Sequence, residues 1–382
     1  MYYITKVAKI QQNSSENYMK KDVCALGREY WDATEDEWGD WHWQLRNSGR
    51  AWSAMRAMGL ADDSLDAVQR RYPTQATPFF LNLSAKASRD DAIIRQTLPD
   101  VAEMTGGEPD PFEEQRHCHV PRLVHRYRDR ALFITTGDCA AHCRHCMRKR
   151  NWGEFPGGPS AEVLASAVDY VSTHPEIREI LVSGGDPLTL EDTELEQVMG
   201  AFARIDHVEV LRLGSRAPAV MPQRLTDGLG AMLESLGKAV FLVAHFNHPQ
   251  ELSKEAADGI LRMLRHGVPT LSQTVLLKGV NDDAETLRLL FTGLLRMRVK
   301  PYYLFHGDPI VGTMHFRTGV ERGLELMAQM RGHVSGMALP SYSFDLPAGG
   351  GKIRLEPGME LPRNDSGELC FESFEGRRIV YR

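Results

Sequence analysis

The sequence has no surplus of positive charge and no long hydrophobic run. Its 382 residues carry a formal net charge of -6, with a pI near 6.2, so it lacks the basic excess that holds nucleic-acid phosphates. The longest apolar runs, such as residues 239–246, are far shorter than the roughly 20 residues of a membrane-spanning helix. The first 22 residues have neither an apolar core nor a small-residue cleavage site, and so predict no secretory signal. We expect a cytoplasmic protein without nucleic-acid or membrane partners.

Cysteine is scarce and unevenly placed. The chain has six cysteines, of which Cys139, Cys143 and Cys146 fall within eight residues while the other three are scattered. A disulfide framework would use spread, paired cysteines, whereas this crowding is typical of a metal site in a reducing compartment.

The N-terminal third is predicted to be helical. Residues 1–22 are polar and patternless and are expected to form a flexible tail. Residues 23–120 predict a helical region, in which Thr34 and Glu37 have the spacing of a capping box. A tryptophan-rich stretch within it is expected to be buried packing: Trp38, Trp41, Trp43 and Trp52. A link that contains Pro and Gly, residues 106–121, leads out of this region.

From residue 131 onward, short β-rich runs alternate with helical patterns. The predicted strands are 131–136, 179–183, 208–214, 239–246, 270–277 and 299–305, and the predicted helices lie near 160–174, 190–204, 226–236, 252–266, 283–297 and 318–331. Six strand–helix units in a row indicate parallel strands with right-handed crossovers. We expect a partial (β/α)6 TIM-like barrel over residues 121–335, with its site at the C-terminal strand ends, and a C-terminal segment, 336–382, that closes the site. A doubly wound sheet is the competing layout.

The three crowded cysteines follow the first predicted barrel strand with the spacing C-x3-C-x2-C. A structural zinc site takes a closed set of four ligands, so three thiolates leave one metal position open. His142 or His145 could complete a zinc site. Alternatively, the thiolates hold a [4Fe–4S] cluster in which one iron stays free for a non-protein ligand.

This cysteine motif resembles the signature of the radical S-adenosylmethionine (SAM) superfamily. The resemblance implies that the free iron binds SAM and that reduction cleaves SAM to a 5′-deoxyadenosyl radical. The second predicted strand ends in a sequence similar to the superfamily's glycine-rich SAM segment: Ser183, Gly184, Gly185 and Asp186.

Over roughly residues 28–360 the chain resembles one branch, the lysine 2,3-aminomutase family. The matching stretches are W-G-D-W-H-W-Q at 38–44, H-R-Y-R-D-R at 125–130, R-H-C-M-R-K-R at 144–150, H-F-N-H-P at 245–249, L-K-G-V-N-D at 277–282, K-P-Y-Y at 300–303, H-F-R-T at 315–318 and D-L-P-A-G-G-G-K at 345–352. The family is dependent on pyridoxal phosphate (PLP).

The resemblance implies that Lys352 forms the aldimine with PLP. The Gly-rich run before it is not a nucleotide-binding loop, because Ile353 stands where that motif needs Ser or Thr. A Schiff-base lysine needs a primary amine that loses its proton when desolvated. The resemblance further implies cationic partners for the PLP phosphate and one ring contact: Arg126, Arg130 and Arg216, with Tyr127.

The resemblance also implies the substrate contacts. Arg148 matches the family's clamp on the substrate α-carboxylate, for which a bidentate guanidinium is well suited. Asp308 and Asp345 match the pair that holds the side-chain ammonium of lysine, and two nearby buried carboxylates require a cation between them. This favours a basic substrate over glutamate. His245 and Gln273 match positions on the SAM side of the site.

The chain also departs from the family pattern. Asp283 stands at the position of a mid-chain zinc cysteine, and the C-terminal cysteine cluster is missing, so we expect no structural zinc. Residues 305–308 read Phe-His-Gly-Asp where lysine enzymes usually have Tyr-Gln-Cys-Asp, and Phe344 precedes Asp345 where a smaller residue is common. These changes keep arginine open as a substrate.

Taken together, the resemblance implies an isomerase that moves the α-amino group of free L-lysine to the β-carbon, giving β-lysine. Arginine, giving β-arginine, is the alternative substrate. Further alternatives are an enzyme acting on a protein-bound lysine and a non-catalytic iron–sulfur protein. A reductant protein such as flavodoxin or ferredoxin and a homo-oligomeric state are the expected partners.

Overall fold

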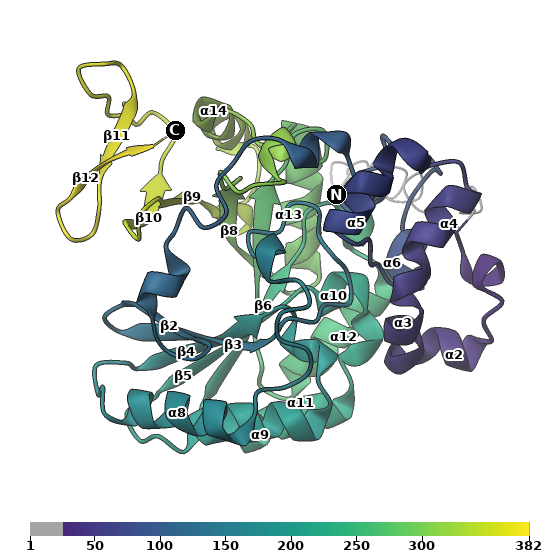
Figure 1. The fold of residues 1–382 in the computed structure, drawn as a ribbon, viewed down its shortest axis with the longest axis horizontal. Coiled ribbons are helices and arrows are strands. Elements are labelled where there is room, and N and C mark those ends of the chain that lie inside the picture. The colour runs from purple at the N-terminus through teal and green to yellow at the C-terminus, as the bar shows by residue number, and fades with distance from the viewer. Residues whose placement is uncertain (1–25, 382) are drawn as a thin grey trace, which may run out of the picture.

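The computed structural model describes residues 26–381 (Figure 1). The tail predicted for residues 1–22 lies outside the described residues. In the described part, no helix is long and apolar enough to cross a bilayer.

Short helices make up the N-terminal region. They are α2 (Glu35–Gly39), α3 (Trp41–Asn47), α4 (Ala51–Ala57), α5 (Asp66–Arg71), α6 (Pro78–Asn82) and α7 (Ala92–Arg95). The predicted capping box is confirmed, because the Thr34 side chain accepts from Glu37 N–H while the Glu37 side chain accepts from Thr34 N–H. Trp41 and Trp43 are buried, and the partly buried Trp38 and Trp52 pack against the same core.

A ten-stranded sheet forms the body of the protein, with its strands side by side in sequence order. Seven strands are parallel neighbours: β3 (Arg130–Thr136), β4 (Glu179–Gly184), β5 (Val210–Ser215), β6 (Ala239–His245), β7 (Thr270–Leu276), β8 (Lys300–His306) and β9 (Ser341–Leu346). A doubly wound sheet would reverse its strand order at a switch point, and this sheet does not. The partial barrel is therefore the observed architecture.

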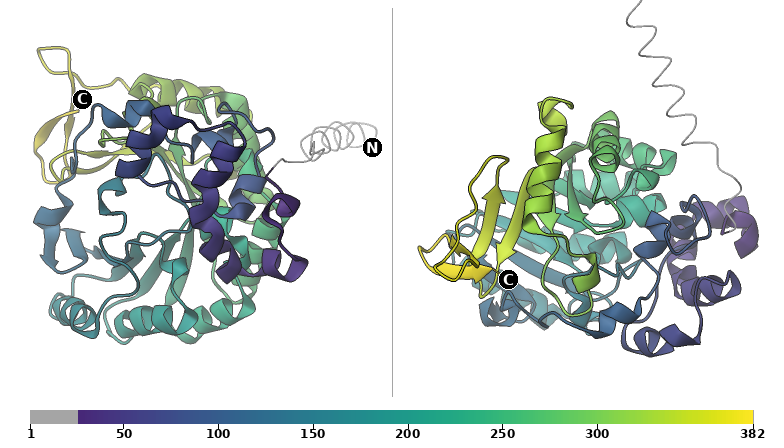
Figure 2. Two further views of the ribbon diagram at one scale, coloured as in Figure 1. Left: turned by 45° about the vertical axis from the view of Figure 1, so that its right-hand side comes forward. Right: turned by 90° about the horizontal axis from the view of Figure 1, so that it is seen from above.

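The predicted helices alternate with these strands and follow the outside of the curved sheet (Figures 1 and 2). They are α8 (Ala161–Ser172), α9 (Asp192–Ala203), α11 (Asp227–Ser235), α12 (Lys254–Arg265), α13 (Ala284–Arg296) and α14 (Val320–Met330), with the short α10 (Ala217–Val220) after β5. All six lie within a few residues of the predicted windows. Asp283, at the position of the family's mid-chain zinc cysteine, caps α13 by accepting from Thr286 N–H at 2.8 Å.

The sheet extends beyond the six predicted strands at both ends. On one side, β1 (Cys118–Val120) and β2 (Leu123–Tyr127) add antiparallel strands to β3. On the other side, β9 continues the parallel order and β10 (Gly351–Leu355) pairs antiparallel with it. The sheet thus reaches past residue 335, into the segment that was expected only to close the site. A separate hairpin, β11 (Leu369–Glu372) and β12 (Arg378–Tyr381), ends the described chain.

A buried ion network joins the N-terminal region to the loop after β3. Glu103, Arg144 and Lys149 have side chains without solvent exposure. The Glu103 carboxylate accepts from Arg144 Nε at 2.9 Å and Nη2, and from Lys149 Nζ at 2.5 Å. Because removal of one member leaves the others as unpaired buried charges, such networks are sensitive to a single substitution.

We expect Glu103→Ala to lower the free energy of unfolding by about 3–5 kcal/mol, because two buried cations lose their counter-ion. Urea denaturation measures this change. Glu325→Ala is the matched control, since its pair with Arg322 is exposed and should contribute little. A loss for Glu103→Ala no larger than that of the control would contradict this role for the network.

Candidate active site

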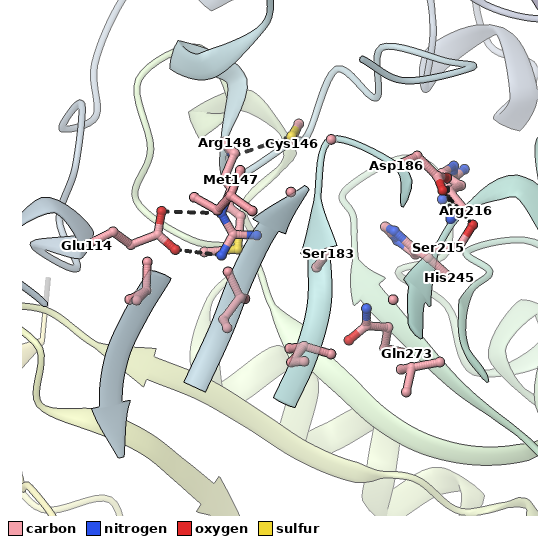
Figure 3. Close-up of a pocket in the computed structure, with 18 of the residues that line it drawn as sticks. Glu114, Cys146, Met147, Arg148, Ser183, Asp186, Ser215, Arg216, His245 and Gln273 are labelled. Atoms are coloured by element: carbon pink, nitrogen blue, oxygen red, sulfur yellow. Dashed lines mark hydrogen bonds and ion pairs between the residues drawn. The ribbon is translucent and has the colours of Figure 1, made fainter. Parts of the chain in front are cut away.

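A cavity of about 660 Å³ opens at the C-terminal ends of the parallel strands, which is a size suited to small-molecule ligands. Part of its lining is drawn in Figure 3. All of the sequence-predicted site residues line it: Arg126, Tyr127, Arg130, Cys139, Cys143, Cys146, Arg148, Ser183, Gly184, Gly185, Asp186, Arg216, His245, Gln273, Asp308, Asp345 and Lys352. Residues that are up to 226 positions apart, Arg126 and Lys352, are thus gathered at one rim.

The three cysteines lie on the loop that follows β3. Burial raises the pKa of each thiol, to about 11 for Cys143, and the Cys139 thiol is further opposed by the charges of Cys146 and Cys143. Cys146 Sγ accepts from the Arg148 backbone N–H at 3.3 Å (Figure 3). Buried thiols that oppose one another as thiolates are stabilised by a bound metal group, which takes up their negative charge.

The histidines that could have completed a zinc site have other partners. His142 Nδ1 lies 2.8 Å from the Pro73 carbonyl oxygen, and the His142 ring stacks on Trp152 with centroids 4.2 Å apart. His145 Nε2 lies 3.1 Å from Asn247 Nδ2. In the part of the chain that the structure describes, no three His, Cys, Asp or Glu side chains converge on one metal-ion position.

The glycine-rich segment at the end of β4 lies directly against the cysteine loop. Gly184 has a φ of 128°, which favours glycine. A Cβ on Gly185 would lie 2.3 Å from the Asp138 carbonyl oxygen and 2.8 Å from the Gly137 carbonyl carbon. Only residues without a side chain allow this approach of β4 to the cysteine loop.

The Asp186 carboxylate organises the neighbouring strand ends. It accepts from the Ser215 hydroxyl at 2.7 Å and from three backbone N–H groups, those of Leu188, Arg216 and Ala217, at 2.8 to 3.1 Å. Burial raises the pKa of Asp186, although these hydrogen bonds oppose the rise. The side chain therefore ties the end of β4 to the end of β5.

Arg216 is not brought next to Arg126, Tyr127 and Arg130. Its Nη2 donates to Gln96 at 2.8 Å and to Glu251 at 3.2 Å, and its charge acts on the thiol of Cys143. Its Nε and Nη1 atoms are buried and have no hydrogen-bond partner among residues 26–381. In Figure 3 it lies beside Asp186 and close to His245.

His245 and Gln273 face each other across β6 and β7, where they are paired in register. His245 Nε2 lies 2.9 Å from Asn247 Oδ1, and burial holds the His245 pKa well below its ordinary value, so the ring is neutral. Both side chains lie on the Asp186 side of the cavity (Figure 3).

Lys352 and four other predicted residues form a second group around β10. Lys352 Nζ donates to Asp345 Oδ2 at 2.6 Å, and its backbone N–H donates to the Tyr127 hydroxyl at 3.0 Å. Arg126 Nη2 donates to Asp345 Oδ1 at 3.1 Å. The Arg130 guanidinium lies 3.9 Å from the centre of the Tyr127 ring. Lys352, Arg126 and Arg130 thus surround the Asp345 carboxylate and the Tyr127 ring.

Asp308 and Asp345, which the resemblance matches to substrate contacts, have opposite pKa shifts. Burial, together with the charge of Asp345, raises the pKa of Asp308 to about 7. Burial also raises that of Asp345, but Lys352 and Arg126 outweigh it and hold the pKa below its ordinary value. The Asp345 carboxylate is therefore balanced by the charges of Lys352 and Arg126, whereas the Asp308 carboxylate lacks a full counter-charge.

Sequence reasoning missed several cavity residues. Glu114 pairs with Arg148 (Figure 3). It lies in the Pro- and Gly-containing link, where two adjacent acidic residues, Glu113 and Glu114, are what an exposed turn would also show. Tyr303 and Phe305 also line the cavity, and Lys352 Nζ lies 4.1 Å from the Phe305 ring centre. Their alternation on β8 was a signal that could have indicated one shared face.

Comparison with known proteins agrees with this geometry. The profile of the radical SAM superfamily matches residues 133–290, and that of lysine-2,3-aminomutase matches residues 327–382. An L-lysine 2,3-aminomutase of Methanococcus maripaludis is 38% identical, covering 90% of this chain and 82% of that protein. An L-lysine 2,3-aminomutase of Acetoanaerobium sticklandii is 36% identical, covering 91% and 85%. The chain belongs to the lysine 2,3-aminomutase family.

The family also contains enzymes with another substrate. A glutamate 2,3-aminomutase of Clostridioides difficile is 36% identical to this chain, covering 91% of it and 83% of that protein. The glutamate enzyme is as similar to this chain as the A. sticklandii lysine enzyme is, and two percentage points less similar than the M. maripaludis one. Overall identity therefore does not distinguish the two substrates.

Membership of this family implies a [4Fe–4S] cluster, SAM and PLP, and the residues present fit these groups. The three buried, mutually opposed thiols form a donor set for a cluster. Gly185 and Arg216 line the same cavity as those thiols, and Arg216 Nε and Nη1 have no hydrogen-bond partner among residues 26–381. Lys352, with Arg126 and Arg130 near it, supplies an amine and two cations for an aldehyde that carries a phosphate.

We expect Gly185→Ala to prevent assembly of the cluster site in this lysine 2,3-aminomutase family member. The added Cβ would overlap the Asp138 carbonyl oxygen, and such overpacking costs about 1–3 kcal/mol or more. Iron and sulfide analysis after anaerobic reconstitution should show much less cluster than in the wild type. Gly158→Ala is the control, since a Cβ there makes only ordinary contacts, at 3.7 Å or more. Equal iron content in both variants would contradict the prediction.

Proposed function

We propose that this protein is a 2,3-aminomutase that converts free L-lysine to β-lysine. The observation that carries the proposal is the pair Asp308 and Asp345, which lines the same cavity as Arg148. Arg148 is suited to the substrate α-carboxylate and the two aspartates to an ammonium at the far end of the side chain. A substrate with both groups matches both ends of the cavity.

The raised pKa of Asp308 supports a cationic side chain. In the free protein, Lys352 and Arg126 satisfy Asp345 but leave Asp308 half protonated near neutral pH. An added ammonium would stabilise the Asp308 carboxylate, whereas a second carboxylate, as in glutamate, would oppose it. This argues for lysine over glutamate, although overall sequence identity does not distinguish the two.

The departures in the pocket loop do not argue for arginine, because most of them face away from the cavity. The His306 ring nitrogen Nδ1 lies 3.0 Å from the Tyr342 hydroxyl, and Phe344 packs on Tyr381 of the C-terminal hairpin with centroids 4.2 Å apart. Neither residue lines the cavity, whereas Phe305 does. The residues that contact the substrate side chain are thus closer to the lysine pattern than the sequence alone indicated.

When bound, the cluster and SAM would supply a 5′-deoxyadenosyl radical, and PLP would supply a conjugated ring system that stabilises an unpaired electron. The roles of the protein's own side chains are simpler. Cys139, Cys143 and Cys146 hold the cluster, and Lys352 binds PLP covalently. Arg126 and Arg130 balance the phosphate charge, and Tyr127 fixes the backbone of Lys352 through its hydroxyl.

We assign Arg216 to the SAM side of the cavity rather than to the PLP phosphate. Its hydrogen bonds to Gln96 and Glu251 hold the guanidinium beside the cysteine loop, and its unpartnered Nε and Nη1 could donate to a carboxylate there. Ser183, Gly184, Gly185, His245 and Gln273 would complete that side, with Asp186 shaping the loop between β4 and α9.

The chemistry requires a one-electron reductant, for which flavodoxin or ferredoxin is the proposed donor. We also propose that the enzyme works in the cytoplasm, where thiols stay reduced and available to iron, and that it forms a homo-oligomer.

The proposal predicts conversion of lysine by the reconstituted enzyme. Iron-loaded protein would be incubated anaerobically with PLP, SAM and a reductant, with lysine, arginine, ornithine or glutamate in separate samples. Mass spectrometry should detect β-lysine, and Lys352→Ala should form none while its cluster content is unchanged. Conversion of glutamate alone would contradict the charge argument. Deoxyadenosine without any β-amino acid would contradict a free amino acid as substrate.

The proposal also predicts a pH dependence that arises from Asp308. Its raised pKa, about 7, means that the carboxyl is neutral below this pH and charged above it. Since the charged form binds the ammonium, kcat/KM for lysine should fall by up to about tenfold per pH unit below pH 7. Asp308→Asn should lower kcat/KM about ten- to hundredfold and remove this acidic limb. An unchanged acidic limb in the variant would assign it to another group.

A further inference from the structure

A carboxylate from outside the barrel occupies one edge of Arg148. Glu114, at the start of the short helix Glu114–His117, accepts from Arg148 Nη2 at 2.6 Å and from Arg148 Nε at 3.3 Å (Figure 3). Both side chains are almost buried, with 12% exposure for Glu114 and 13% for Arg148. Both line the cavity.

This pairing leaves a defined part of the Arg148 guanidinium for another ligand. A guanidinium has five N–H groups in a rigid fork, and Glu114 takes those on the Nε–Nη2 edge. No hydrogen-bond partner of Arg148 Nη1 is found among residues 26–381, and this atom is not one of the fully buried unpartnered ones. The Nη1 edge is therefore the part of Arg148 that remains for a carboxylate in the cavity.

Glu114 is itself held in place. Arg150 Nη2 donates to Glu114 Oε2 at 2.8 Å and also lies 3.1 Å from Asp110 Oδ1. Arg150 Nη1 donates to the Pro109 and Met147 carbonyl oxygens, at 3.3 Å each. Burial raises the pKa of Glu114, but Arg148 and Arg150 outweigh it and keep the pKa below its ordinary value. The carboxylate thus stays charged between two guanidinium groups.

Two roles for such a carboxylate are physically distinct. It could be a substitute for the substrate carboxylate, displaced when substrate binds, or a fixed support. Displacement would break contacts to two arginines and leave a buried carboxylate unpaired, which is strongly unfavourable. The contacts to Arg150 do not depend on the cavity at all, so they favour the fixed support.

We propose that Glu114 is a positioning residue, which holds the Nε–Nη2 edge of Arg148 so that the Nη1 edge faces the substrate α-carboxylate. This inference rests on the proposed role of Arg148 in the aminomutase reaction. Glu114 acts only through Arg148 and does not touch the substrate. Without Glu114 the Arg148 guanidinium can rotate. Binding of the substrate carboxylate must then fix its orientation, which lowers the affinity for substrate.

The test compares Glu114→Gln with its neighbour Glu113→Gln. The second variant makes the same change in charge, but Glu113 is partly exposed and pairs with Arg116 at the surface. The amino acid that the wild type converts is used as substrate, and its amide, which lacks the carboxylate, is used as a competitive inhibitor. Iron content and PLP absorbance establish that each variant carries its cofactors.

We expect Glu114→Gln to raise KM by about tenfold, with a smaller change in kcat and an unchanged inhibition constant for the amide. Glu113→Gln should leave KM within about twofold of the wild type. An unchanged or lower KM for Glu114→Gln would overturn the proposal, because a displaced substitute for the substrate would then be the better description. Equal weakening of the amide would overturn it too, because the defect would not concern the carboxylate.

A double-variant cycle separates this inference from the role of Arg148. In an Arg148→Met background, Glu114→Gln should raise KM no further, because the side chain that it positions is absent. A further increase of the same size would assign Glu114 a structural role independent of Arg148. If Arg148→Met alone leaves KM unchanged, the proposed function of Arg148 fails. A large effect of Arg148→Met with none from Glu114→Gln would contradict only the inference about Glu114.

Discussion

The structure depends on how the charges that flank the cysteines are neutralised. The stretch from the second cluster cysteine onward carries four cations within seven residues: Arg144, Arg148, Lys149 and Arg150. Two glutamates from the N-terminal side each pair with two of them, Glu103 with Arg144 and Lys149 and Glu114 with Arg148 and Arg150, and Asp110 is a second partner of Arg150. Since unpaired buried charges are strongly unfavourable, the cysteine loop reaches its position only when the segment before the barrel is folded against it.

The sequence predicted the strands and helices whose hydrophobic residues follow a clear periodic pattern. The six central strands and their helices were found because apolar runs and amphipathic windows alternate over residues 130–330. The strands at the sheet ends were not found. The strands in residues 118–127 and 341–355 are short and polar in part, and within each of these two segments no helix separates the strands. Only pairing with a neighbouring strand makes them β-structure. The consequence for the site is direct, because Asp345 and Lys352 are opposite each other in the β9–β10 pairing.

The resemblance to a known family predicted which residue types line the cavity but not the direction in which each side chain points. His306 and Phe344 change the pocket loop in sequence, yet neither lines the cavity, and both rings lie against Tyr381 of the C-terminal hairpin. Arg216 matched a PLP contact, and in the structure, just after β5, it pairs with Glu251 while its charge acts on the Cys143 thiol. Glu114 had no signal at all, because an acidic residue in an irregular link gains a partner 34 positions away only through the fold.

The charges along the cavity are arranged differently at its two ends, and the difference defines the ligand. At the Arg148 end, two carboxylates face two guanidinium groups, so the side chains are balanced before any ligand enters. At the Lys352 end, Asp345 pairs with Lys352 and Arg126, whereas burial and the charge of Asp345 raise the pKa of Asp308 to about 7 against the opposing charges of Lys352 and Arg317. A ligand that brings one positive charge to Asp308 lets this carboxyl ionise, whereas a ligand with a negative charge there forces it to stay protonated. The proposed preference for a cationic side chain therefore rests on Asp308, the carboxyl that the surrounding cations do not fully balance.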